Sequence, residues 1–170
     1  TWGQFTKAQP NLTLRGVNGG NFGNASLESA VQVVYDGVPA TKAFMMTLPV
    51  YDLDRVEIMR GPQGTTFGRN ATLGLMHFVS ARPSQETSGA IEGTVGDLNL
   101  FAVNGHYNTA LSDTLSGRIA FNYQDTDGVM EDRNTGKALE ASENTSVRVS
   151  LLYEPSDSFS AYLKAEVIKD

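Results

Sequence analysis

Apolar and polar residues alternate along five segments in the second half of the chain, with the period of two that half-buried β-strands show. Each segment spans roughly 9–11 residues and carries apolar side chains on one face and polar side chains on the other. The alternation is clearest over 90–95, 101–108, 115–124, 146–153 and 159–167. This pattern predicts either strands of a membrane β-barrel or strands of a soluble β-sandwich.

The connections between these segments differ in length. Residues 111–114 and 154–157 are predicted to be tight turns, whereas 125–144 form a long, polar and acidic loop. Short turns at one end of the strands and long loops at the other are typical of outer-membrane barrels. We therefore expect the long loop, and more loosely the bend at 97–100, to be extracellular. Five strands cannot close a barrel, because the edge strands would expose unpaired amides to hydrocarbon.

The first half of the chain also contains segments with strand character, separated by regions rich in glycine and asparagine. Strands are predicted at 11–17, 31–35, 54–60 and 73–80. A short helix over 26–34 is an alternative to the second of these strands. The strand at 54–60 ends at Gly61-Pro62, because proline has no amide hydrogen and glycine readily adopts a positive φ. The sequence thus predicts a small sheet with glycine-rich connections.

Composition excludes several classes of function. The net charge of −6 argues against a broad nucleic-acid surface, and the absence of cysteine excludes disulfides and thiolate metal sites. The two histidines, His77 and His106, are far apart in the sequence and lack metal-site spacing, so no metal or other cofactor is predicted. The loop after Gly61 lacks the ending of a phosphate loop, and no Gly-x-Ser-x-Gly nucleophile motif is present. None of these patterns indicates a catalytic site.

Three motifs occur in a characteristic order in the first half. They are Val34-Tyr35-Asp36-Gly37-Val38-Pro39, then Asp52-Leu53-Asp54-Arg55-Val56-Glu57-Ile58-Met59-Arg60-Gly61-Pro62-Gln63-Gly64-Thr65-Thr66-Phe67-Gly68-Arg69-Asn70-Ala71-Thr72, and finally Ala81-Arg82-Pro83. In motif order and spacing, residues 11–83 resemble the plug domain of TonB-dependent outer-membrane receptors. The chain departs from that family at 73–78, where paired glycines and a small-apolar-Asn run are usual and Leu-Gly-Leu-Met-His-Phe stands instead.

The resemblance implies a mainly β protein in two parts. Residues 1–83 would be the C-terminal part of an α+β plug domain. Residues 84–170 would be the first five antiparallel strands of a transmembrane barrel, which has 22 strands in the large plugged receptors. The implied function is uptake of a scarce nutrient, most often an iron–siderophore complex, across the outer membrane of a Gram-negative bacterium. The implied partners of this monomeric barrel are a TonB-type inner-membrane energy-transducing protein, outer-membrane lipid and the small-molecule substrate.

Two alternatives remain open at this point. A soluble secreted β-sandwich that binds carbohydrate or protein would show the same alternation in the second half. A signalling receptor of the same family would need an N-terminal extension. The segment that contacts the energising partner is expected to precede Thr1.

A set of charged residues is predicted to act as a latch that holds the plug. Hydrogen bonds and ion pairs must hold a plug inside a polar lumen, and the rigid fork of arginine suits that task. The latch comprises Arg15, Arg55, Glu57, Arg60 and Arg69. The resemblance implies that Arg15 and Arg60 bond to carboxylates of the barrel wall. In the alternative interpretation these residues are surface charges, with Arg55 and Glu57 paired along one strand.

Two further groups complete the predicted site. The first consists of glycines that allow tight turns in the plug, namely Gly61, Gly64 and Gly68. The second consists of residues on loops that would face the substrate, and the alternative for its apolar members is simple loop packing. These loop residues are Asn18, Asn21, Phe22, Asn24, Lys42, Phe44 and Met45.

Overall fold

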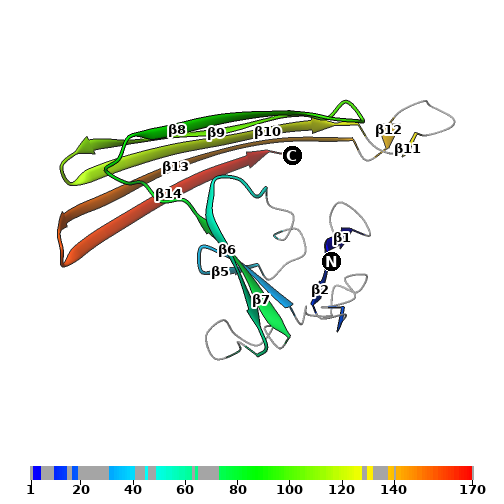
Figure 1. The fold of residues 1–170 in the computed structure, drawn as a ribbon, viewed down its shortest axis with the longest axis horizontal. Coiled ribbons are helices and arrows are strands. Elements are labelled where there is room, and N and C mark those ends of the chain that lie inside the picture. Colours follow the sequence, from blue (N-terminus) through cyan, green and yellow to red (C-terminus); the bar gives the residue numbers. More distant parts are fainter. Residues whose placement is uncertain are drawn as a thin grey trace. The chain divides into compact units, whose positions relative to one another are not determined.

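The structure is a computed structural model and describes residues 2–4, 10–14, 17–18, 31–40, 45, 49–62, 64, 73–127, 130–131, 138–139 and 141–169. The chain divides into two compact units, Thr1–Ser80 and Ala81–Asp170. Strands make up most of the described residues (Figure 1), which confirms the predicted mainly β class. Among the described residues, no helix has the length and apolar character needed to cross a membrane.

The first unit contains a four-stranded sheet with the order β5-β4-β7-β6. Its strands are β4 (Val31–Tyr35), β5 (Val38–Ala40), β6 (Leu53–Arg60) and β7 (Gly74–Ser80). The central strands β4 and β7 are parallel, and both outer pairs are antiparallel. Residues 31–34 are strand, so the helical alternative is wrong there. Three short strands, β1 (Trp2–Gln4), β2 (Pro10–Leu14) and β3 (Val17–Asn18), form a separate antiparallel sheet.

The core of the four-stranded sheet lies on both faces of its two central strands. On the opposite face from the main cluster, Val34 and Leu75 are fully buried. The main cluster consists of Val31, Val33, Ala40 and Phe78. Central parallel strands are usually buried on both sides, which explains why residues 31–34 of β4 are all buried, Gln32 included, and do not alternate.

The edge strand β6 departs from the predicted half-buried pattern. Val56 and Ile58 stand opposite Phe78 and Met76 of β7, so they share the face of the main cluster. They are nevertheless 46% and 55% exposed. The alternation correctly predicts the strand but not its burial, because a strand at the sheet edge has a neighbour on one side only.

Tyr35 lies beside the main cluster and has a buried hydroxyl. Its ring stacks on that of Phe78 with 5.0 Å between the ring centroids, and burial raises the pKa of Tyr35 to about 12. Among the described residues, the hydroxyl oxygen has no hydrogen-bond partner. Tyr35→Phe is therefore expected to raise the free energy of unfolding by about 1 kcal/mol, because it removes an unsatisfied buried polar group. Chemical denaturation measures this change, and a decrease in stability would contradict it.

The second unit is a five-stranded antiparallel sheet with the order β14-β13-β10-β9-β8. Strands that are neighbours in this sheet also follow one another in the sequence, so the chain folds as a meander (Figure 1). The one interruption among the described residues is the small pair of β11 (Met130–Glu131) and β12 (Ala138–Leu139) between β10 and β13. The strands are β8 (Ser88–Val95), β9 (Phe101–Ser112), β10 (Leu115–Thr126), β13 (Ser142–Ser156) and β14 (Phe159–Lys169). All five predicted segments are strands, and each extends beyond its alternating centre.

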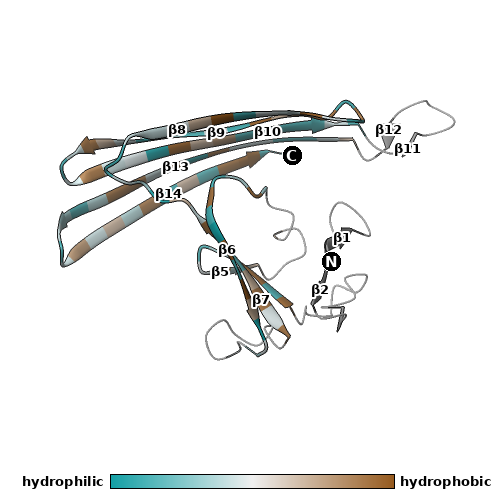
Figure 2. Ribbon diagram, viewed as in Figure 1, coloured by the Kyte–Doolittle hydropathy of each residue, from teal (hydrophilic) through white to brown (hydrophobic). Residues whose placement is uncertain are grey.

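The two faces of this sheet reverse the arrangement of a soluble sheet. Ile91, Leu163 and Val167 on the apolar face are 76%, 66% and 72% exposed. On the polar face, Asn108 and Ser150 are at most 2% exposed. Figure 2 shows the alternation as brown and teal bands along the strands. So large an exposed apolar surface indicates an apolar environment or partner.

The turns at one end of the sheet are close to those predicted. Residues 113–114 connect β9 to β10, but the predicted turn at 154–157 is displaced. Strand β13 continues through Pro155 to Ser156, and the turn follows at 157–158. The register of β13 against β14 changes between Tyr153 and Ser156. Proline has no amide hydrogen for the ladder, which accounts for an irregularity at this point.

The connections at the other end are longer. Strand β10 reaches Thr126, and within the predicted loop β11 (Met130–Glu131) pairs with β12 (Ala138–Leu139). In the bend at 97–100, Leu98 and Asn99 have φ of 59° and 54°. Asn99 Nδ2 donates a hydrogen bond to Asp127 Oδ2 at 2.5 Å, which links this bend to the end of β10.

Candidate functional site

The Asp36-Gly37 turn joins β4 to β5 and is tied to β7. Asp36 and Gly37 have φ of 46° and 83°, and a two-residue type I′ turn requires both to be positive. The Asp36 carboxylate accepts hydrogen bonds from the Ser80 amide at 2.7 Å and from the Ser80 hydroxyl at 2.8 Å. The Asp36 amide donates to the Phe78 carbonyl at 3.0 Å. The sequence predicts the turn but not the contacts that hold it against β7.

His77 on β7 extends this network to β6. The Gly37 amide donates to His77 Nε2 at 3.1 Å, and His77 Nδ1 lies 3.1 Å from Glu57 Oε2. Because Nε2 accepts a hydrogen bond, the proton of the neutral imidazole is on Nδ1, which donates to the carboxylate. His77 stands in the segment where the sequence departs from the plug resemblance. At this departure from the family pattern, the His77 side chain links the Asp36-Gly37 turn to the edge strand β6.

Arg55 forms the exposed end of the network. Its Nε donates to Glu57 Oε1 at 2.7 Å, and its Nη1 donates to Asp54 Oδ2 at 2.6 Å. The structure thus contains the Arg55–Glu57 pair along one strand. Hydrogen bonds from Arg55 and then from His77 lower the pKa of the Glu57 carboxyl. The two carboxylates raise the pKa of Arg55, Glu57 more than Asp54.

The lowered pKa of Glu57 gives a pH dependence with a definite sign. Glu57 stabilises the fold above the pKa of an unfolded-chain glutamate, about 4.3, and this contribution is lost as the pH falls through the lower folded-state pKa. Glu57→Gln is expected to remove this part of the acid destabilisation below about pH 4. Urea denaturation at a series of pH values measures it, with Glu92→Gln, an exposed strand glutamate, as the control. Equal acid slopes in wild type and Glu57→Gln would contradict the assignment.

The other predicted latch residues are placed as follows. Arg60 is the last residue of β6 and is exposed. Arg15 and Arg69 lie outside the described residues. Of the predicted latch residues, Arg55, Glu57 and Arg60 lie within the described part of the chain. Arg55 and Glu57 are linked there to Asp54 and His77, neither of which is in the predicted set. His77 lies directly opposite Glu57 on the neighbouring strand. The sequence would reveal this contact only if the β6–β7 register were known.

The predicted glycines differ in what they require. Gly61 has φ of 87°, and its amide donates to the Leu73 carbonyl at 3.1 Å. A Cβ added at Gly61 or at Gly64 would meet no atom within 4 Å. The requirement at Gly61 is thus a left-handed backbone and not close packing. Gly68 lies outside the described residues.

Two of the predicted substrate-facing residues can be placed. Asn18 is the last residue of β3, and Met45 packs against the main buried cluster of the first unit. The other five lie outside the described residues; they are Asn21, Phe22, Asn24, Lys42 and Phe44.

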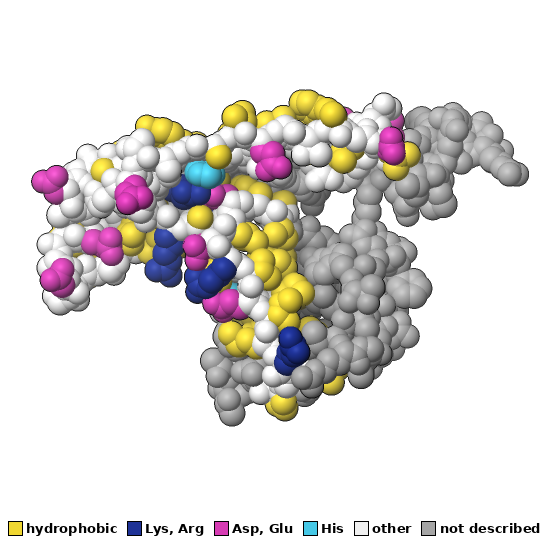
Figure 3. All heavy atoms as spheres, in the orientation of Figure 1, with side chains coloured by type: hydrophobic (Ala, Val, Ile, Leu, Met, Phe, Trp, Pro, Cys, Tyr) yellow, Lys and Arg dark blue, Asp and Glu magenta, His cyan; other side chains and the backbone are white. Residues whose placement is uncertain are grey.

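The polar face of the five-stranded sheet contains an ion pair between a buried arginine and a half-buried glutamate, which the sequence analysis missed. Arg148 is 4% exposed, and its Nη2 donates to Glu166 Oε1 at 3.1 Å. The two residues are directly opposed on β13 and β14, where opposite charges attract. In Figure 3, apolar side chains (yellow) stand along the upper margin of the sheet, whereas charged side chains (dark blue and magenta) lie below that margin.

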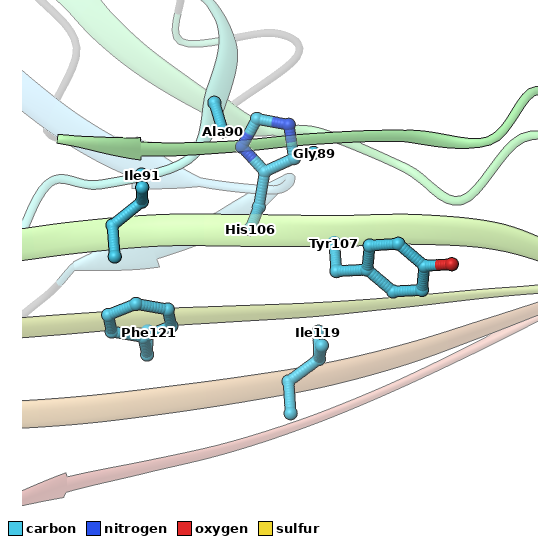
Figure 4. A pocket seen from close by; sticks show the side chains of 7 residues that line it. All are labelled: Gly89, Ala90, Ile91, His106, Tyr107, Ile119 and Phe121. Atoms are coloured by element: carbon cyan, nitrogen blue, oxygen red, sulfur yellow. The ribbon is translucent and has the colours of Figure 1, made fainter.

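The apolar face of the sheet carries an open groove of about 550 Å³, whose lining includes Ile91, Tyr107, Ile119 and Phe121. In Figure 4 the His106 side chain points away from these residues. Phe121, which lines this groove, packs closely against Gly105 of the neighbouring strand. A Cβ there would lie 2.8 Å from the Ala90 carbonyl oxygen and 2.9 Å from the Phe121 ring. The Phe121 ring therefore covers the backbone of the neighbouring strand.

Comparisons with known proteins match both units. The family model described as "TonB-dependent Receptor Plug Domain" matches residues 2–75. The ferrioxamine receptor of Yersinia enterocolitica is 24% identical over 159 residues, which are 94% of this chain and 21% of that protein. The pesticin receptor of the same species is 32% identical over 74% of this chain and 18% of its own length. The crystal structure of the ferric yersiniabactin uptake receptor from Yersinia pestis has a TM-score of 0.77 and 28% identity, covering 89% of this chain and 24% of that one.

These matches establish the class of the protein. The chain belongs to the TonB-dependent receptors of the Gram-negative outer membrane and contains part of the plug and the first strands of the barrel. It spans about a fifth of the length of the relatives that it matches. The family consists of transport receptors and not of enzymes.

Proposed function

We propose that the whole protein is an outer-membrane receptor that takes up a scarce nutrient, a ferric siderophore, by TonB-dependent movement of its plug. In this proposal residues 1–83 are plug and 84–170 are barrel wall. The partners are a TonB-type inner-membrane protein, outer-membrane lipid and the small-molecule substrate. The barrel acts as a monomer.

The reversed faces of the five-stranded sheet are the observation that carries this proposal. A soluble sandwich buries its apolar face, whereas here the apolar face is exposed and the polar face carries the buried side chains of Asn108, Arg148 and Ser150. In a membrane barrel the apolar face contacts hydrocarbon and the polar face lines the lumen. Five strands with free edges then form one arc of a larger barrel.

The substrate class is proposed from the relatives. Those named above include a ferrioxamine receptor and a ferric yersiniabactin uptake receptor. We infer an iron complex as substrate, contacted by the loops around Asn18–Asn24 and Lys42–Met45. These loops include the residues predicted from the sequence to face the substrate.

Uptake by the full-length receptor tests the function. Radioactive iron complexed with siderophores of different chemical classes is supplied to cells that express the receptor in strains with and without TonB. We expect accumulation of at least one complex that requires both the receptor and TonB. Uptake that is independent of TonB would overturn the proposal. Full-length protein that is extracted without detergent would instead support the soluble sandwich that binds carbohydrate or protein.

Arg60 provides a test of the proposed latch. It stands exposed at the end of β6, beside Gly61, where the chain turns. In the full-length receptor Arg60→Ala is expected to accelerate amide hydrogen exchange in the plug, because an ion pair with the barrel wall is lost. Arg60→Lys is the matched control, because it keeps the positive charge at this position. Unchanged plug protection in Arg60→Ala would contradict the latch.

A further inference from the structure

The segment that precedes β8 is bound to the sheet by one buried side chain. Asn108 on β9 is 0% exposed. Its Oδ1 accepts a hydrogen bond from the Ser84 amide at 3.1 Å, and its Nδ2 donates to the Ser84 carbonyl and hydroxyl, both at 3.0 Å. Nδ2 also donates to the Glu86 carbonyl. Every hydrogen-bonding atom of the amide is thus used by two residues of this segment.

A second contact holds the same segment elsewhere on the sheet. The Arg82 guanidinium lies over the Tyr162 ring of β14, with Cζ 5.0 Å from the ring centroid. The positive charge of the guanidinium is attracted to the negative face of the aromatic ring. Pro83, between the two anchored residues, is buried. Proline also restricts the backbone, which lowers the entropy lost when the segment is ordered.

The two contacts are far apart across the sheet. Strands β9 and β14 are separated by β10 and β13, so three strand spacings, about 14 Å, lie between them. Ser116 and Leu152 occupy the cross-strand row of Tyr162 and are buried. The segment 82–86 therefore forms a strap on the polar face, held by the Arg82–Tyr162 contact at one end and by the Asn108 hydrogen bonds at the other.

We propose that this strap is a fixed part of the barrel wall and that Asn108 is the positioning residue that holds it. This inference rests on the proposed function, in which the plug moves. Because the chain is fastened from Arg82 onward, movement of the plug has to bend the chain before Arg82, at Ser80 and Ala81. The strap then keeps the C-terminal end of the plug tethered during uptake.

Two substitutions at Asn108 test the anchor in the full-length receptor. Asn108→Ala removes every contact. The isosteric Asn108→Asp keeps an acceptor for the Ser84 amide but turns its second oxygen toward the Ser84 and Glu86 carbonyls, which now receive a hydrogen bond. We expect the Ser84 amide to exchange about tenfold faster in Asn108→Ala and to show a smaller increase in Asn108→Asp, where only the bonds from Nδ2 are lost. Substrate affinity should stay unchanged while the maximal rate of uptake falls. Asn104→Ala, on the same face of the same strand, is the control.

Each outcome of that experiment is decisive for the strap. Faster exchange at Ser84 with unchanged affinity and slower uptake in both variants supports it. Exchange and uptake equal to those of Asn104→Ala overturn it. If wild-type uptake proves independent of TonB, the proposed function fails, whereas the exchange data still report on the strap.

Discussion

Val149→Lys is expected to destabilise the barrel in a bilayer by about 2–4 kcal/mol, because it places a charge on the hydrocarbon-facing side of the sheet. Val149 lies in the middle of β13 and is 46% exposed on the apolar face. In a soluble protein a substitution at so exposed a position would change stability by no more than about 0.5 kcal/mol. The size of the effect therefore distinguishes the membrane barrel from the sandwich.

The measurement is the unfolding free energy of the full-length receptor in lipid vesicles, together with its assembly into outer membranes. Asn104→Lys is the matched control, because Asn104 lies in the middle of β9 on the polar face. We expect this control to assemble normally, since a charge in the lumen stays hydrated. Equal, small effects of both substitutions would favour a soluble sheet.

Asp36→Ala is expected to lower the stability of the plug by about 3 kcal/mol. Two hydrogen bonds to the Asp36 carboxylate are lost, and each bond to a charged group contributes about 1.5–3 kcal/mol. Alanine also tolerates the positive φ of this position less well than aspartate does. The Ser80 amide and hydroxyl would be left without this acceptor at the end of β7.

Hydrogen exchange of the Ser80 amide in the full-length receptor measures this effect. Asp36→Asn should have a smaller effect, because asparagine accepts hydrogen bonds and adopts a positive φ readily. Asp54→Ala is the control, since its pair with Arg55 is exposed and contributes about 0–1 kcal/mol. An effect of Asp36→Ala no larger than that of Asp54→Ala would contradict the role of the turn.

Local pattern determined the elements of this fold well. Each of the five alternating segments is a strand, and Asp36-Gly37 is a turn, because side-chain period and turn chemistry act over a few residues. Burial was predicted less well. Val56 and Ile58 alternate correctly but are exposed, since burial depends on which strands become edges.

The candidate site shows the same division. The Arg55–Glu57 pair could be predicted, because residues two apart on a strand share a face. The bridge through His77 and the hydrogen bonds of Asn108 to Ser84 could not, since they join positions far apart in the sequence. Such contacts are fixed by strand register, which local sequence does not reveal.

The sequence by itself determined that the protein is mainly β, that it resembles the plug and first barrel strands of TonB-dependent receptors, and where most strands lie. Only the tertiary structure decided which face of the five-stranded sheet is buried, how the Asp36-Gly37 turn is bound to β7 and how the strap is held by Asn108. The physical reason is that the alternation of apolar and polar residues identifies the two faces of a strand but does not determine which face is buried. Burial and long-range hydrogen bonds arise only when strands take their places beside one another.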